Sequence, residues 1–352
     1  MIHMSAGVGT LGDMLVGVTD SGPPLEIPHM LPTYSNMQTL TKSHREHREL
    51  GEMAWLRDFE QAQAEARARS KPILLLFQEV PGCSTCVNFG QDVLSHPLMV
   101  DMIEDHFVPL AIFNNHPGPD ATILRRFGEA AWNNPVIHFI AADGAPIVPR
   151  LANRYDPLGL HSKIAQVLAS RDDPIPAYFD LLGRDLLVET GLAEAATYTT
   201  PCFWSGETSL AQHSAVISTD AGWVHGEEVV RVLFDPREGG RAALDGHAHE
   251  EGFRPIDGRS FALDREPQFY LRKSAMRFLP LSPAQRSAIN LALPYRRDAK
   301  ELLSHRQRTW LNDPRLEQAS EGELYRLDIR QGWALLEDAL GRPAQGAQVQ
   351  PI

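Results

Sequence analysis

Two of the three cysteines in this 352-residue chain, Cys83 and Cys86, are separated by two residues. They follow an apolar run over residues 72–78, and the sequence after them is typical of a helix. A cysteine at the start of a helix is acidified, because the helix dipole and the free backbone N–H groups stabilise its thiolate. We therefore expect Cys83 to be an attacking thiolate and Cys86 to be the thiol that resolves its mixed disulfides.

Half of a structural zinc site is the alternative interpretation of this pair. Such a site commonly takes four ligands from two Cys-x-x-Cys pairs, and the sequence has only one pair. Thiol redox chemistry without a metal or another cofactor is therefore the favoured hypothesis. Two thiols also bind soft ions such as copper(I) or mercury(II), so a metal-trafficking protein stays open as an alternative.

The segments around the pair alternate between strand and helix patterns. Strand patterns lie at residues 72–78, 107–113, 136–140 and 146–148. Helix patterns lie at residues 58–69, 84–105, 121–127 and 160–170. Pro97 is expected to break or kink the second helix, Pro109 to mark an edge strand or a bulge, and Asp143-Gly144 to form a hairpin turn. This order predicts an α/β layer structure with a mixed sheet.

Residues 52–170 resemble the thioredoxin fold, and Asn134-Pro135 lies where that fold carries a cis-proline facing the redox pair. The resemblance implies that Pro135 is cis and presents its neighbours' backbone to an extended substrate. Asn134 and Trp132 flank this proline and are expected to shape substrate access.

The motif at residues 80–86, Val-Pro-Gly-Cys-Ser-Thr-Cys, supports a narrower resemblance. It is similar to the VPGUxxT family of thioredoxin-like proteins and selenoproteins, in which the residue matching Cys83 can be selenocysteine. This resemblance implies that Cys83 is the position that must be a strong nucleophile.

The third cysteine, Cys202, precedes two large aromatic residues, Phe203 and Trp204. A cysteine in such surroundings is more often a buried small hydrophobic residue than a nucleophile. Glu207 follows five residues later, where a carboxylate acts either as an acid or base or as a helix cap. The residues alone leave both alternatives open.

Cys202-Phe203-Trp204 together with Glu207 resembles the active-site motif of peptide methionine sulfoxide reductase A, and the resemblance extends over about residues 189–295. It implies a second, α+β domain in which Cys202 attacks a sulfoxide sulfur and Glu207 protonates the sulfoxide oxygen. Phe203, Trp204 and Trp223, which replaces a tyrosine of that family, would bind the substrate.

Reduction of a sulfoxide in this way leaves a sulfenic acid that a second thiol must clear. No cysteine follows Cys202 in the sequence, so we expect Cys83 to attack the oxidised Cys202 and Cys86 to resolve the mixed disulfide. The expected partners are an oxidised thiol, sulfoxide or disulfide substrate and an external dithiol reductant. A redox module beside a non-catalytic, client-binding domain is the other alternative.

The expected domains are an N-terminal extension at 1–50, a thioredoxin-like domain at 51–172, a methionine sulfoxide reductase A-like domain at 177–295, and a C-terminal helical extension and tail at 296–352. A net charge of −12 argues against nucleic acid and anionic membranes as partners. A basic cluster is interpreted as a solvated helix face, and it comprises Arg296, Arg297, Lys300, Arg306 and Arg308. Without an export signal, the expected location is cytoplasmic, where thiols stay reduced.

Overall fold

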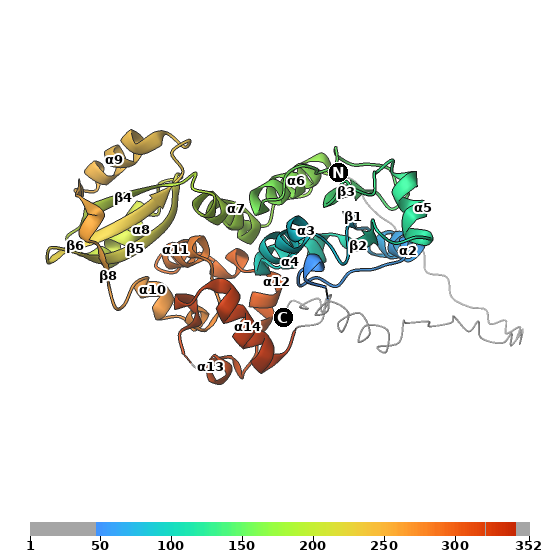
Figure 1. Cartoon of the computed structure of the whole chain (residues 1–352). Coiled ribbons are helices and arrows are strands. Elements are labelled where there is room, and N and C mark those ends of the chain that lie inside the picture. Colours follow the sequence, from blue (N-terminus) through green and yellow to red (C-terminus); the bar gives the residue numbers. More distant parts are fainter. Residues whose placement is uncertain (1–46, 321, 343–352) are drawn as a thin grey trace, which may run out of the picture.

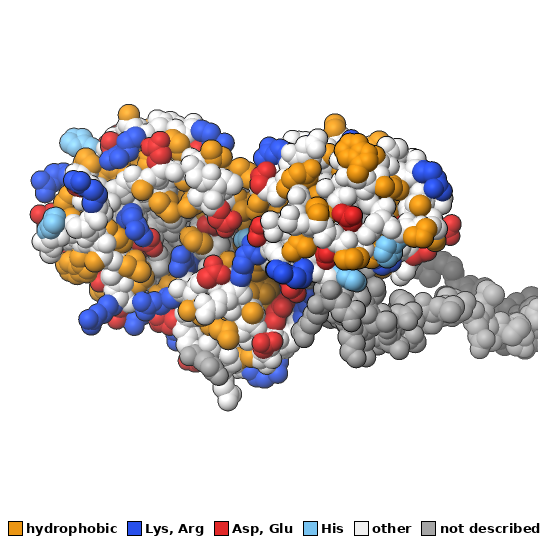
Figure 2. Space-filling model, viewed as in Figure 1, with side chains coloured by type: hydrophobic (Ala, Val, Ile, Leu, Met, Phe, Trp, Pro, Cys, Tyr) orange, Lys and Arg blue, Asp and Glu red, His pale blue; other side chains and the backbone are white. Residues whose placement is uncertain are grey.

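The structure is a computed structural model that describes residues 47–320 and 322–342, and it places two sheet-containing lobes side by side (Figure 1). Helices α6 (Pro157–Ser170) and α7 (Ala177–Glu189) connect the lobes, and the C-terminal helices lie against both of them. Acidic and basic side chains are interspersed over the visible face (Figure 2). No helix within the described ranges is long and apolar enough to cross a membrane.

The first lobe is built around β1 (Ile73–Gln78), in which all six residues are buried. This strand pairs in parallel with β2 (Val108–Phe113) and antiparallel with β3 (Val136–Ile140), in the order β2-β1-β3. The apolar run after residue 72 is thus confirmed as a central strand of a mixed sheet. Pro109 lies in the edge strand β2, where the missing N–H is tolerated.

Two layers of helices cover this sheet. Side chains that alternate along the strands bury one face against α2 (Phe59–Arg69) and α5 (Pro119–Arg126). The opposite face packs against α4 (Pro97–His106) and α6. Because both faces are covered, the strands are apolar apart from Gln78 and His138 and do not alternate with polar residues.

The predicted helix over 84–105 is divided into three parts. A short α3 (Ser84–Asn88) continues as a π-helical turn, η2 (Phe89–Val93), and the chain restarts as α4 with Pro97 in its first turn. The expected break at Pro97 is confirmed, since proline fits only the first turn of a helix.

The prediction of a return strand at residues 146–148 is wrong. The hairpin turn at Gly144 forms, but the following chain makes only isolated bridges, Ile140 with Pro146 and Ile137 with Leu151. Pro146 and Pro149 lack the N–H groups that a continuous ladder requires.

The second lobe contains a βαββαβ unit. Its elements are β4 (Glu194–Thr199), α8 (Phe203–Leu210), β5 (Val216–Val224), β6 (Glu227–Phe234), α9 (Gly240–Glu250) and β7 (Arg254–Pro255). With the added β8 (Ala262–Leu263), the strand order is β7-β4-β6-β5-β8 and every pair is antiparallel. The first four strands in this order, β7-β4-β6-β5, are arranged as in a ferredoxin-like sheet. The expected α+β second region is therefore present.

The remaining helices fill the space below the two lobes in Figure 1. They are α10 (Phe269–Arg272), α11 (Pro283–Ala292), α12 (His305–Leu311), α13 (Leu316–Ala319) and α14 (Ile329–Leu340). Short 3₁₀ turns lie at Arg48–Leu50, Gly258–Ser260, Ala275–Phe278, Ala299–Leu302 and Leu324–Arg326. Trp310 and Trp333 pack edge to face and belong to the same apolar core as α4. This core therefore joins the C-terminal helices to the first lobe.

One expectation about the C-terminal region is corrected. Arg306 does not lie on a solvated helix face, because it is buried and pairs with Asp101 and Glu104 of α4 and Glu337 of α14. Residues 1–46 and 343–352 lie outside the described residues. They include most of the predicted N-terminal extension and the predicted C-terminal tail.

Candidate functional site

The dithiol lies at the end of β1 and the start of α3. Cys83 is the N-cap residue of α3 and is exposed, whereas Cys86 lies one turn later and is fully buried. Their Sγ atoms are 3.7 Å apart, and neither forms a disulfide. Cys83 Sγ is thus open to a substrate, whereas Cys86 Sγ is shielded from solvent beside it.

The surroundings shift the pKa values of the two thiols in opposite directions. The backbone N–H of Cys86 is the main cause that holds the pKa of Cys83 below its ordinary value. Burial raises the pKa of Cys86 to about 12, and its thiol donates a hydrogen bond to Oδ1 of Asn134 at 2.6 Å. At neutral pH this favours a thiolate at Cys83 and a protonated thiol at Cys86.

The loop before Cys83 is held by buried polar groups. The Gly82 N–H donates to Glu49 Oε1 at 2.7 Å, and Gln78 Nε2 donates to the carbonyl oxygens of Glu49 and Cys86. A Cβ atom on Gly82 would lie 2.3 Å from the Glu79 carbonyl oxygen and 2.7 Å from Cys86 Cβ. Only glycine therefore lets the chain pass this close to the resolving thiol.

The segment around Pro135 completes the dithiol site. The Asn134–Pro135 peptide bond is cis, as the resemblance implied, and Val80–Pro81 is a second cis bond that the sequence analysis did not predict. Asn134 contacts the Cys86 thiol directly. Trp132, two residues earlier, exposes 84% of its surface. The structure thus brings Asn134 to the dithiol and leaves Trp132 open to solvent.

A buried carboxylate anchors this segment to the sheet. Glu129 accepts a hydrogen bond from Asn133, forms an ion pair with Arg150 at 3.0 Å and contacts His138 Nε2 at 2.8 Å. His138 lies on β3 between the rings of Phe77 and Phe127. The histidine therefore has a supporting position and does not contact the dithiol.

Cys202 is the N-cap residue of α8 in the second lobe, and it is partly buried. The predicted aromatic neighbours form a cluster beside it. The Phe203 ring meets Trp223 edge to face at 5.4 Å, and Trp204 stacks on Phe269 at 4.3 Å. The structure therefore gathers Phe203, Trp204 and Trp223 at the start of this helix.

Glu207 lies on the same helix and is completely buried. Its two carboxylate oxygens accept the backbone N–H groups of Ala221 and Gln268 at 3.1 Å and 3.0 Å. Burial raises the pKa of Glu207 more than these hydrogen bonds lower it, so the pKa lies well above its ordinary value. The carboxyl group is thus disposed to keep a proton, which is what a proton donor requires.

The described residues contain no sulfur–sulfur contact between Cys202 and the dithiol. The helices α3 and α8 lie in different lobes (Figure 1). The expected direct exchange between Cys83 and Cys202 therefore requires the lobes to move or a second molecule to take part.

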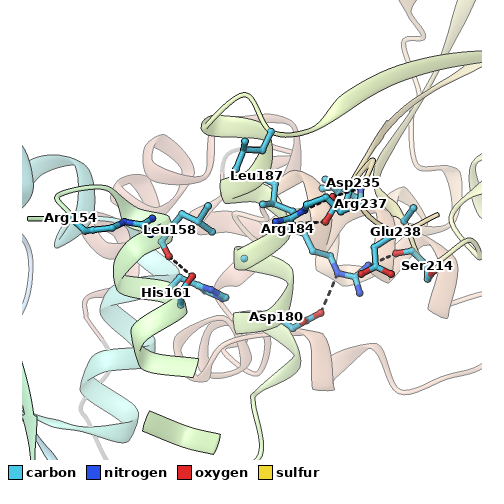
Figure 3. A pocket seen from close by; sticks show the side chains of 15 residues that line it. Arg154, Leu158, His161, Asp180, Arg184, Leu187, Ser214, Asp235, Arg237 and Glu238 are labelled. Atoms are coloured by element: carbon cyan, nitrogen blue, oxygen red, sulfur yellow. Dashed lines mark hydrogen bonds and ion pairs between the residues drawn. The ribbon is translucent and has the colours of Figure 1, made fainter. Parts of the chain in front are cut away.

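Two cavities of about 580 Å³ each are lined by residues other than the three cysteines. One is lined by α6, α7 and the loops next to β5 and β6 (Figure 3). Its Arg184 pairs with Asp180, and its Arg237 pairs with Asp235. The positive charges there are already neutralised, so this cavity gives no evidence of an anionic ligand.

Residues 54–142 match a protein-family model described as thioredoxin-like. The solved structure of a "DsbH Oxidoreductase" is similar at 17% identity and a TM-score of 0.29, covering 34% of this chain and 83% of that one. No curated protein matches the sequence. The family match alone identifies a thioredoxin-like domain in the first lobe. The descriptions of these two matches name neither the VPGUxxT family nor methionine sulfoxide reductase A, and the family model ends at residue 142.

Proposed function

We propose that this protein is a thiol–disulfide oxidoreductase in which Cys83 is the nucleophile and Cys86 the resolving thiol. The observation that carries the proposal is the difference in exposure and pKa between the two thiols. An exposed sulfur with a lowered pKa lies 3.7 Å from a buried sulfur with a raised pKa, in a thioredoxin-like domain. This combination supports nucleophilic attack by one residue and resolution by the other.

The reaction transfers two electrons from the dithiol to a substrate disulfide. The Cys83 thiolate attacks one substrate sulfur, which breaks the substrate disulfide and releases the first substrate thiol. Cys86 then attacks Cys83 Sγ, releases the second substrate thiol and leaves a Cys83–Cys86 disulfide. The proton of Cys86 and one proton from solvent end on the two released thiols, and an external dithiol restores the reduced protein.

Trapping of the mixed disulfide tests this order of events. We expect Cys86→Ser, incubated with oxidised glutathione, to accumulate one glutathione on Cys83, because the resolving step is missing. Cys83→Ser serves as the matched control and should acquire none on Cys86, which is buried. Intact-protein mass spectrometry followed by peptide mapping measures both. Glutathione on Cys86 of Cys83→Ser at a similar rate would reverse the two roles.

The second lobe supports a finer proposal, in which Cys202 reduces methionine sulfoxide or a related sulfoxide. Support comes from the cysteine's position at a helix N-cap, from the aromatic cluster beside it and from the protonated state favoured at Glu207. Cys202 would take the sulfoxide oxygen and become a sulfenic acid while the thioether leaves. Cys83 would then displace water to form a Cys202–Cys83 disulfide, and Cys86 would free Cys202.

Peroxide treatment of Cys86→Ser tests whether the two sulfurs of this relay meet, since stoichiometric peroxide converts one cysteine to a sulfenic acid that the other would attack. We expect a Cys83–Cys202 link in non-reducing mass spectra. A yield that is independent of protein concentration would place both sulfurs in one molecule, and a yield that rises with concentration would place them in two. If Cys202 stays unmodified, the relay is wrong and the second lobe is a client-binding domain, as the alternative predicts.

A further inference from the structure

The dithiol has a third potential ligand beside it that the exchange reaction does not use. Ligand atoms of Glu79, Cys83 and Cys86 all lie within 4.8 Å of one another, and this trio is the only such group of three among the described residues. Glu79 is the last residue before the Val-Pro-Gly segment and is partly buried. Its carboxylate therefore belongs to the same local structure as the two sulfurs.

The distance between the two cysteine sulfurs fits tetrahedral coordination of a zinc ion. A Zn–S bond of about 2.3 Å and a tetrahedral angle place two thiolate sulfurs about 3.8 Å apart. The observed separation of Cys83 Sγ and Cys86 Sγ is 3.7 Å. A zinc-bound carboxylate oxygen would lie about 3.6 Å from each sulfur. The Glu79 carboxylate lies within 4.8 Å of both sulfurs, so binding requires its partly exposed side chain to rotate toward them.

We propose that the reduced protein binds one Zn²⁺ ion through Cys83, Cys86 and Glu79, and that this ion blocks thiol–disulfide exchange. Cys83 binds as the thiolate, and Cys86 loses its proton to solvent as the two Zn–S bonds form. The mixed sulfur and oxygen set suits a borderline divalent ion, whereas a carboxylate adds little for copper(I) or mercury(II).

The fourth coordination position would face solvent, because Cys83 is exposed. Zinc sites with three protein ligands keep that position for water or an incoming ligand. The nucleophilic sulfur is thus occupied without being sealed off, and a chelator or a competing thiol is able to remove the ion. Blockage of exchange rests on the proposed function of the dithiol, whereas zinc binding itself does not.

The test is a zinc titration of the reduced full-length chain against a chromogenic chelator, without any disulfide substrate. We expect one equivalent of zinc per chain in the wild type and in Cys202→Ser. Glu79→Gln should weaken binding by at least about tenfold, since one anionic ligand is lost. Glu60→Gln is the matched control, because Glu60 is exposed on α2 and outside the cluster, and it should bind like the wild type.

Spectroscopy of the bound ion gives a second measurement. X-ray absorption should show two sulfur ligands at about 2.3 Å together with oxygen ligands, and the sulfur contribution should fall in Cys83→Ser. Equal affinities of Glu79→Gln and Glu60→Gln would overturn the assignment of Glu79. Binding that survives loss of either Cys83 or Cys86 would overturn the site as a whole. Neither result bears on glutathione trapping at Cys83, so failure of this inference leaves the proposed function standing.

Discussion

Replacement of Cys83 by serine is expected to lower the rate of thiol–disulfide exchange by a factor on the order of 10³ or more, as removal of a catalytic nucleophile does in other enzymes. A serine hydroxyl stays protonated at neutral pH, so the only exposed sulfur of the dithiol is lost. Cys86 does not replace it, because it is buried and its pKa is raised to about 12. The measurement is the steady-state reduction of a small soluble disulfide with an external dithiol in excess.

Two further variants make this result specific. Cys202→Ser should keep the wild-type rate with a small disulfide, because Cys202 does not contact the dithiol in the described structure. Cys86→Ser should complete one attack per molecule and then slow, since its mixed disulfide persists until the external dithiol clears it. A rate for Cys83→Ser within tenfold of the wild type would contradict the proposed nucleophile.

The features of the fold and the site that could be predicted from the sequence are those determined by neighbouring residues in the chain. The burial of β1 follows from an uninterrupted apolar run, and the break before α4 follows from the chemistry of Pro97. The position of Cys83 at a helix start follows from its place directly after a strand and a Pro-Gly segment. Each of these depends on residues within one or two turns of one another.

The features that were missed depend on contacts between distant residues. Glu49 fixes Gly82 from 33 positions away, and no local pattern indicates that pairing. Asn134 was placed near the substrate because of its proline, but its hydrogen bond to the Cys86 thiol emerges only when β3 lies beside β1. Glu79 adjoins the cysteine motif, so a search for carboxylates next to the thiols would have found it.

The local sequence pattern was misleading for Arg306. A run of basic residues at an expected helix indicates a solvated face, but Arg306 is buried. Its burial depends on acidic partners about 200 residues earlier, at Asp101 and Glu104. Arg306 contacts these carboxylates at 2.8 Å and 2.6 Å, and Glu337 at 2.8 Å. The charges lie on three helices, α4, α12 and α14, so this cluster joins the C-terminal region to the first lobe.

Arg306→Ala is expected to lower the free energy of unfolding by about 3–5 kcal/mol, the usual loss when one partner of a buried ion pair is removed. Most of the loss comes from carboxylates left without their counter-charge, since Arg342 still pairs with Glu104 but no other cation pairs with Asp101 in the described residues. Urea denaturation measures the change. Arg297→Ala is the control, because Arg297 is exposed, and its effect should stay within about 0.5 kcal/mol.

The effect of Arg306→Ala should also depend on pH, and the sign follows from the carboxylate that remains. Burial already raises the pKa of Asp101 to about 6 although Arg306 opposes this, so loss of the arginine raises that pKa further. A carboxyl group whose pKa is higher in the folded state stabilises the fold below its unfolded pKa of about 4, and this contribution is lost as pH rises through the folded pKa. We therefore expect a larger destabilisation at pH 8 than at pH 5. An equal or smaller loss at pH 8 would mean that water reaches the carboxylates and replaces the guanidinium group.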